Sequence, residues 1–137
     1  TRLSEALAWC TANRSKPVGT LGDLNSRTQS DCPSSSQLTR VSSDTEPTNQ
    51  RGAWLLRTCE EGTLDILNGT CFERGAPGGF TSFQPNGKAV VDYALFSRGF
   101  LNMLSVDSLQ VVPVPSDWSD HAILALHVVI PPALSTA

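Results

Sequence analysis

The chain has 137 residues, of which 39% are hydrophobic, and this length and composition suit one globular domain with its own core. Its formal net charge of −3 argues against a protein that holds nucleic acid through a general basic surface. The longest apolar run, Ala122 to Ile130, is interrupted by His127 and is far shorter than the roughly 20 residues that a membrane span needs, so we expect no membrane-spanning segment.

The sequence contains four cysteines, at positions 10, 32, 59 and 71, and their spacing matches neither a zinc finger nor a redox motif. An even number would permit two disulfides. Because a chain of this length can fold without cross-links and shows no secretory feature, we expect free thiols.

The first elements along the chain are a helix and a strand. Apolar residues recur at helical spacing over Leu3 to Asn13, which predicts a short amphipathic helix. Pro17 to Leu21 is typical of a brief buried strand that runs directly into Gly22-Asp23-Leu24-Asn25. Asp23 and Asn25 would then lie where a strand ends and a loop begins, which is a frequent position for catalytic groups.

The next segment, Ser26 to Gln50, is rich in serine, threonine, aspartate and proline and has almost no apolar residues. Such a composition contributes little to a core. We therefore predict a flexible insertion at residues 26–50. A structureless stretch of this length is often functional, but a solvated insertion without a catalytic role is the alternative.

The remaining chain alternates between apolar and turn-forming segments. Gly52 to Glu60 has an apolar face at helical period and is followed by Gly62, in the position favoured after a helix end. Asn-Gly within Pro85-Asn86-Gly87 is a strong hairpin signal. The strands that we expect are Leu64 to Leu67, Phe80 to Phe83, Val90 to Leu95, Ser105 to Val112 and Ala122 to Ile130, with a turn over Arg98 to Met103.

Ala122 to Ile130 is apolar on both faces, which predicts a central strand covered from two sides. Since helices and strands interleave, the predicted class is α/β or α+β, with a mixed sheet and layers on both of its faces.

Three short signatures carry the chemistry: Gly22-Asp23-Leu24-Asn25, Val91-Asp92-Tyr93 and Ser119-Asp120-His121. Each alone has an ordinary structural explanation: a turn that bonds its own backbone, a paired buried carboxylate, and a loop cap. In series, each at the edge of an apolar strand, they indicate a metal-dependent phosphodiesterase site. Breaking a phosphate ester needs an aimed water, charge stabilisation and a divalent cation.

These residues resemble the endonuclease/exonuclease/phosphatase superfamily, which includes deoxyribonuclease I. The segments Gly79-Phe80-Thr81, Asn86-Gly87-Lys88, Val90 to Leu95 and Ser119-Asp120-His121 are most similar to the retrotransposon-type endonuclease domains of that superfamily. The likeness covers roughly Val18 to Ile130 and corresponds to the C-terminal half of the family domain. It implies half of a four-layer α/β sandwich with mixed, largely antiparallel sheets, so that residues 1–137 would form a partial domain.

The resemblance also assigns roles to individual residues. Asp23 would orient or deprotonate the attacking water, Asn25 would hold the scissile phosphate, and His121 would contact a phosphoryl oxygen while Asp92 bonds its other ring nitrogen. Asp120, together with Asp23, would hold Mg²⁺ or Mn²⁺, hard cations that prefer oxygen ligands. The expected substrate contacts are Asn25, Arg27, Thr81 and Lys88.

The chain departs from the family pattern in two places. Family members have an asparagine and a metal-ligating glutamate upstream of Gly22, whereas Glu5 lies on the predicted helix and cannot replace them. Position 89 is Ala, where many relatives have serine or threonine, which removes one phosphate contact. Together with a first residue that is Thr1 and not Met, this predicts a piece of a longer polypeptide that is inactive on its own.

The implied partners are DNA and the rest of the parent polypeptide, in an intracellular location that includes the nucleus. Two alternatives stay open at this point. One is a non-catalytic, degenerate remnant of such a domain, and the other is a phosphatase of the same superfamily that acts on soluble phosphoesters. A preference for soluble phosphoesters over DNA would identify the phosphatase.

Overall fold

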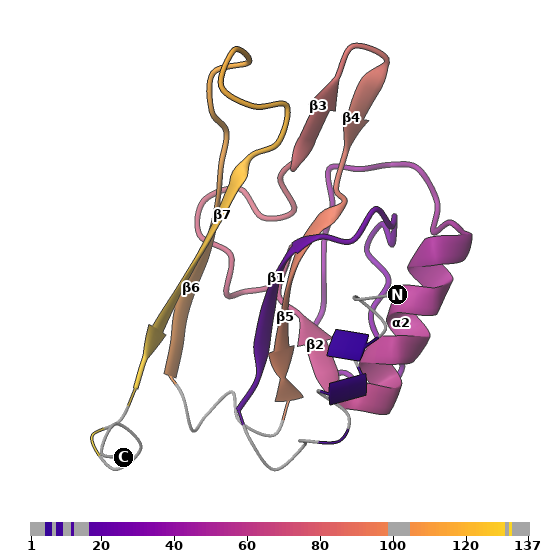
Figure 1. Cartoon of the computed structure of the whole chain (residues 1–137), viewed down its shortest axis with the longest axis vertical. Helices are drawn as coiled ribbons and strands as arrows, with labels where there is room; N and C mark the ends of the chain where they lie inside the picture. Colours follow the sequence, from indigo (N-terminus) through magenta and orange to yellow (C-terminus); the bar gives the residue numbers. More distant parts are fainter. Residues whose placement is uncertain are drawn as a thin grey trace.

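In the elements that it describes, the computed structural model combines helix α2 with short antiparallel strands, which is an α+β arrangement (Figure 1). It describes residues 17–98 and 105–130, together with residues 5, 6, 8, 9, 12 and 132. The elements in chain order are β1 (Gly19–Asp23), α2 (Gln50–Gly62), β2 (Leu64–Ile66), β3 (Ser82–Gln84), β4 (Gly87–Ala89), β5 (Asp92–Ser97), β6 (Ser105–Val112) and β7 (Ile123–Val129).

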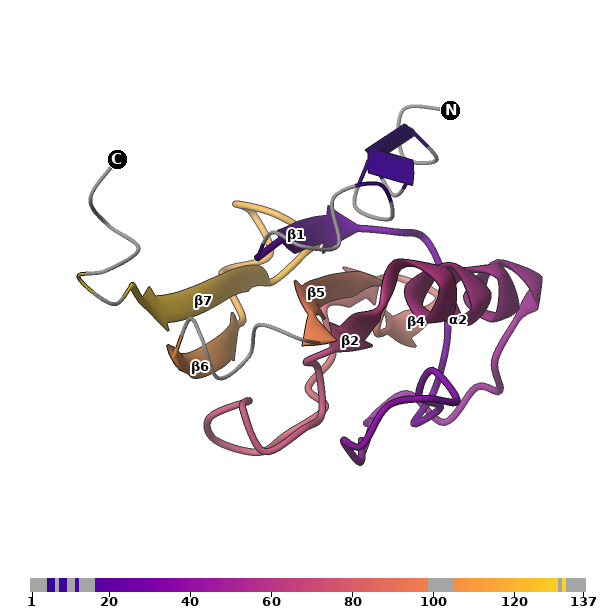
Figure 2. The ribbon, with the colours of Figure 1, turned by 90° about the horizontal axis from the view of Figure 1, so that it is seen from below.

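The described strands form three small sheets, and every pair of strands in these sheets is antiparallel. The first sheet has the order β1-β5-β2, and the other two are the pairs β3-β4 and β6-β7. In Figures 1 and 2, β6 and β7 lie to one side of β5, and α2 lies to the other side. The expected α+β class is therefore present in the described residues, with antiparallel strands in place of a mixed sheet.

Strand β5 is the central strand of the molecule and is buried along its whole length. Tyr93 and Leu95 pack into a cluster with residues of α2 and β2, whereas Ala94 and Phe96 pack on the opposite face against a cluster that includes Leu109 of β6. Alternate side chains of a strand point to opposite faces, so β5 joins both parts of the core.

Strand β7 is not the central strand predicted for Ala122 to Ile130. Its residues alternate between exposed and half-buried, and it pairs with β6 alone among the described strands. Ile123 and Val129 are 53% and 50% exposed. An apolar stretch predicts burial on both faces only if the fold provides two covering layers, and the described residues provide one.

Helix α2 begins after Asn49, whose side-chain oxygen accepts a hydrogen bond from Gly52 N at 2.8 Å and so caps the first turn. It continues two residues beyond the predicted end. The left-handed residue is Thr63 (φ 54°), whose backbone N–H bonds carbonyls of the last turn. Gly62 is therefore the last helical residue and not the left-handed one.

Residues 26–50 lack helices and strands except at Gln50, as their composition predicts, but they pack against the core. Arg40 is buried, and its Nε donates to Asn68 O at 2.8 Å. Asp44 is also buried, and its Oδ2 accepts a hydrogen bond from Val90 N. The segment adds no buried residue to the two hydrophobic clusters, as its composition predicts, but buried polar side chains attach it to the neighbouring backbone.

The predicted hairpin is present but is shorter than expected. Its turn consists of Pro85 and Asn86, since Gln84 pairs with Gly87 across the two strands. Val90 and Val91 leave the hairpin, and the chain then enters β5. Figure 1 shows the hairpin and the β6–β7 connection at the same end of the molecule.

The described part of the chain contains no helix with the length and apolar character required to cross a bilayer. The helix predicted over Leu3 to Asn13 and the turn predicted over Arg98 to Met103 fall largely outside the described residues. Cys32, Cys59 and Cys71 are free thiols.

Candidate functional site

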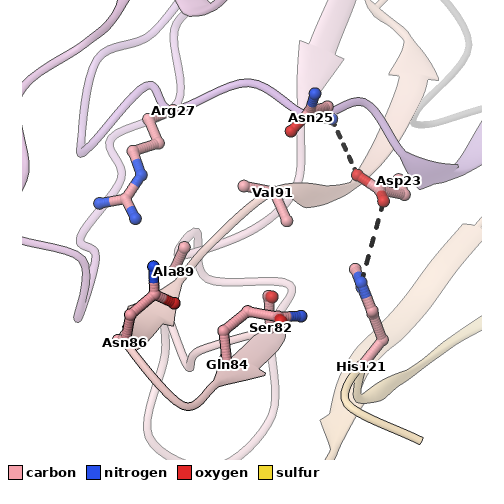
Figure 3. A pocket seen from close by; sticks show the side chains of 10 residues that line it. Asp23, Asn25, Arg27, Ser82, Gln84, Asn86, Ala89, Val91 and His121 are labelled. Atoms are coloured by element: carbon pink, nitrogen blue, oxygen red, sulfur yellow. Dashed lines mark hydrogen bonds and ion pairs between the residues drawn. The ribbon is translucent and has the colours of Figure 1, made fainter.

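A polar cleft of about 370 Å³ lies between the end of β1 and the β3–β4 hairpin (Figure 3). Most of its lining side chains are polar, and they come from segments far apart in the sequence. The polar lining residues that matter below are Asp23, Asn25, Arg27, Ser82, Gln84 and His121.

Asp92 and His121 form the best-defined pair at the cleft. Asp92 Oδ2 lies 2.8 Å from His121 Nδ1, and the Asp92 side chain is only 10% exposed. A carboxylate can only accept a hydrogen bond, so the ring carries its proton on Nδ1 and leaves Nε2 free. The hydrogen bond with Asp92 raises the pKa of His121, and the charges of Asp92, Asp23 and Asp120 add to this rise, against a lowering by partial burial.

Buried groups hold both members of this pair in place. Thr81 Oγ1 accepts a hydrogen bond from Asp92 N at 3.1 Å, and Asn68 Nδ2 donates to Asp92 O at 2.9 Å. On the other side, His121 bridges to Ser82 of the hairpin as an isolated antiparallel pair. The Asp92–His121 pair therefore depends on the contact between the hairpin and the start of β5.

Asp23 is the last residue of β1, and it lies opposite Asp92 in the β1–β5 pairing. Its Oδ1 accepts a hydrogen bond from Asn25 N at 2.8 Å, while its Oδ2 lies 3.9 Å from His121 Nε2. Asn25 has a left-handed backbone (φ 46°), which asparagine tolerates better than most residues. This local turn places Asn25 on the cleft wall beside Asp23 (Figure 3).

Arg27 supplies a positive charge to the cleft from the side opposite His121 (Figure 3). Its Nη1 lies 3.1 Å from Asp44 Oδ1, and Asp44 is almost fully buried. The arginine is therefore fixed at one nitrogen by a carboxylate that itself accepts from Val90 N. The predicted contacts Asn25 and Arg27 do line the same cleft as Asp23 and His121.

Two predicted substrate contacts, Thr81 and Lys88, do not line the cleft. Thr81 is fully buried, and its hydroxyl oxygen accepts from Val91 N and Asp92 N, so it positions Asp92 instead of meeting a ligand. Lys88 does not line the cleft, and its Nζ lies over the rings of Phe80 and Phe83.

Asp120 lies near the His121 ring but does not line the cleft. Its Oδ1 lies 3.9 Å from His121 Nε2, and its Oδ2 accepts a hydrogen bond from Gln84 Nε2 at 2.6 Å. It lines a neighbouring apolar hollow and not the cleft itself. The sequence reasoning missed Gln84, and the signal that could have found it is its position one residue before the turn, on the same face of the hairpin as Ser82.

One group among the described residues has the ligand atoms for a metal ion: Asp23, Asp92 and His121 offer one atom each, within 4.8 Å of one another. Asp120 adds a further carboxylate beside the same ring. In the described part of the chain, no glutamate lines the cleft.

Comparisons of the chain with protein-family models, with curated proteins and with solved structures found no match.

Proposed function

We propose that this cleft belongs to a metal-dependent phosphodiester hydrolase of the DNA endonuclease type. The observation that carries the proposal is the convergence of the three sequence signatures: Asp23, Asp92 and His121 lie within one small group at the cleft, with Asn25 and Arg27 beside them. Strand pairing, and not proximity in sequence, brings these residues together.

The charges around the cleft favour a cation as part of the site. Asp23, Asp92 and Asp120 surround His121, and Arg27 already has Asp44 as its partner. A phosphodiester is an anion, so carboxylates in excess would repel it. A divalent cation reverses this repulsion and gives a reason for so many acidic groups around one phosphate position.

Asp23 and Asp120 are the residues that would hold Mg²⁺ or Mn²⁺, because both offer carboxylate oxygens and both side chains are about half exposed. When bound, the cation would neutralise charge on the phosphoryl oxygens. Its requirement for oxygen ligands is met by these two aspartates without Asp92, whose Oδ2 is engaged by His121.

The protein groups then have distinct tasks. Asp23 lines the cleft and has Oδ1 engaged by Asn25 N, so its Oδ2 would accept a proton from the attacking water or orient that water. The Asn25 amide and the Arg27 guanidinium donate hydrogen bonds to phosphate oxygens. His121 donates from Nε2 to a phosphoryl oxygen, and its raised pKa, which results from Asp92, favours the protonated ring that this step needs.

Nicking of supercoiled plasmid DNA tests the proposal, with the chain alone and with a longer polypeptide that adds upstream residues to it. We expect the longer polypeptide to show Mg²⁺-stimulated, chelator-sensitive nicking that Asp23→Asn and His121→Ala reduce by about 10²–10⁴-fold, and the chain alone to be inactive. His127→Ala is the matched control, because His127 is an exposed histidine outside the cleft and also pairs with an aspartate. Hydrolysis of soluble phosphoesters in preference to DNA would support a phosphatase.

A non-catalytic remnant is the second candidate, and one observation favours it: among the described residues no glutamate reaches the cleft. The same assay separates the two candidates. Absence of chelator-sensitive nicking from both proteins would exclude the hydrolase and leave the remnant.

A further inference from the structure

The two described histidines share one feature and differ in another. His121 Nδ1 lies 2.8 Å from Asp92, and His127 Nδ1 lies 2.9 Å from Asp107. A histidine that is fixed by a carboxylate at one ring nitrogen presents the other as an oriented metal ligand, and such outer carboxylates also raise ligand basicity. In both rings a carboxylate therefore orients Nδ1 and leaves Nε2 as the nitrogen that could bind a metal.

Only His121 has acidic groups near the other nitrogen. Its Nε2 lies 3.9 Å from Asp23 Oδ2 and 3.9 Å from Asp120 Oδ1. Asp23 is at the end of β1 and Asp120 lies in the β6–β7 connection, so two separate segments bring carboxylates to one imidazole nitrogen. The described ion pairs of His127 contain Asp107 alone.

These distances leave room for an ion. At 3.9 Å neither carboxylate makes a hydrogen bond with the ring. Ligand atoms about 2.0–2.1 Å from a tetrahedral zinc lie about 3.3 Å from each other, so modest side-chain rotations would bring Nε2 and a carboxylate oxygen onto one ion. The Asp120 side chain is 55% exposed, and it would reach the ion by giving up its described hydrogen bond to the exposed Gln84.

We propose that His121 Nε2 and Asp23 Oδ2, with Asp120 closing the site, bind a transition-metal cation of the zinc class. An imidazole nitrogen among the ligands favours Zn²⁺ over Mg²⁺, which takes oxygen ligands and keeps much of its water. Asp92 remains on Nδ1 and orients the ring. Three protein ligands leave a fourth position for water or an anion.

The site has a consequence that rests on the proposed function. Zn²⁺ bound to His121 Nε2 would displace the proton that this nitrogen donates to the phosphate, and it would also occupy the Asp23 oxygen that hydrolysis uses. It would therefore inhibit nicking even in excess Mg²⁺. Zinc binding itself does not depend on any hydrolytic activity, and the two claims can fail separately.

The test is a titration of the chain with Zn²⁺, followed by NMR of the histidine ring nitrogens. Exposed Cys71 could take zinc elsewhere, but a signal from the ring nitrogen does not register that binding. We expect one equivalent of Zn²⁺ to shift the Nε2 resonance of His121, and an excess of Mg²⁺ not to do so.

Variants then identify the ligands. Asp23→Asn and Asp92→Asn should each weaken the His121 response to zinc about 10–100-fold, as ligand and outer-partner changes do. Asp107→Asn is the matched control and should leave it unchanged. A His121 resonance that zinc does not move in the wild-type chain would overturn the proposal, as would an equal response at His127.

Discussion

The Thr81 hydroxyl is the buried contact through which the hairpin holds Asp92, and Thr81→Val removes it at nearly constant shape. Thr81 is fully buried, and its Oγ1 accepts from Val91 N at 3.0 Å and from Asp92 N at 3.1 Å. Valine leaves both backbone donors without this acceptor. An unsatisfied buried donor costs about 1–3 kcal/mol.

Because the Asp92 donor is buried and the Val91 donor only partly so, we expect Thr81→Val to lower the free energy of unfolding by about 2–3 kcal/mol. With a urea m-value of about 1–3 kcal/mol/M, the unfolding midpoint should fall by roughly 1 M. Thr81→Ser is the control: it keeps the acceptor and loses one methyl group, at a cost of about 1 kcal/mol. If Thr81→Val is no less stable than Thr81→Ser, the hydroxyl does not hold Asp92.

Three further predictions follow from burial, backbone conformation and charge. Asp92 raises the pKa of His121 above 6.5, so wild type should be more stable than His121→Gln, fully so below about pH 6.5 and less so as pH rises through the raised pKa. Urea unfolding midpoints of the two proteins measure this difference, and a difference that grows with pH would contradict the prediction. Burial raises the pKa of Cys59 to about 12, so at pH 8 only about one thiol in 10⁴ is ionised. Iodoacetamide should therefore label Cys59 in urea but hardly in the native protein, and equal labelling rates in the two conditions would argue against this. Gly69→Ala should destabilise the protein far more than Gly75→Ala. Both glycines have positive φ, but only at Gly69 would a Cβ lie 1.9 Å from a backbone carbonyl oxygen. Equal urea unfolding midpoints for the two variants would refute this.

The positions of the main site residues could be predicted because each stands at the end of an apolar stretch. The sequence placed Asp23 after a strand, and the structure makes it the last residue of β1, opposite Asp92. His121 precedes β7 and bridges to Ser82. The sequence alone does not specify these two pairings, so the convergence itself could only be a hypothesis.

The hairpin contacts were harder to predict because a shift of one residue reverses every side chain. Asn-Gly favours a turn at Asn86 and Gly87, but the observed pairing of Gln84 with Gly87 places the turn at Pro85 and Asn86. This register puts Gln84 on the cleft and Lys88 on the other face. A turn preference alone does not decide such a register.

Residues 26–50 show that composition does not predict which polar side chains are buried. Few of them are apolar, yet Arg40 and Asp44 are buried, because their side chains bond the backbone of Asn68 and Val90. Such pairings join residues that are far apart in sequence. Hydrophobic patterning contains no signal for them.

The central claim is that Asp92 acts through His121 at a phosphodiester-cleaving site. Two measurements on Asp92→Asn test it most directly: the pKa of His121 by NMR and the rate of Mg²⁺-dependent plasmid nicking. We predict that both fall together, the rate by about a hundredfold, because the neutral amide no longer stabilises the charged ring. A lowered pKa with an unchanged nicking rate would contradict the account, since His121 would then take no part in cleavage.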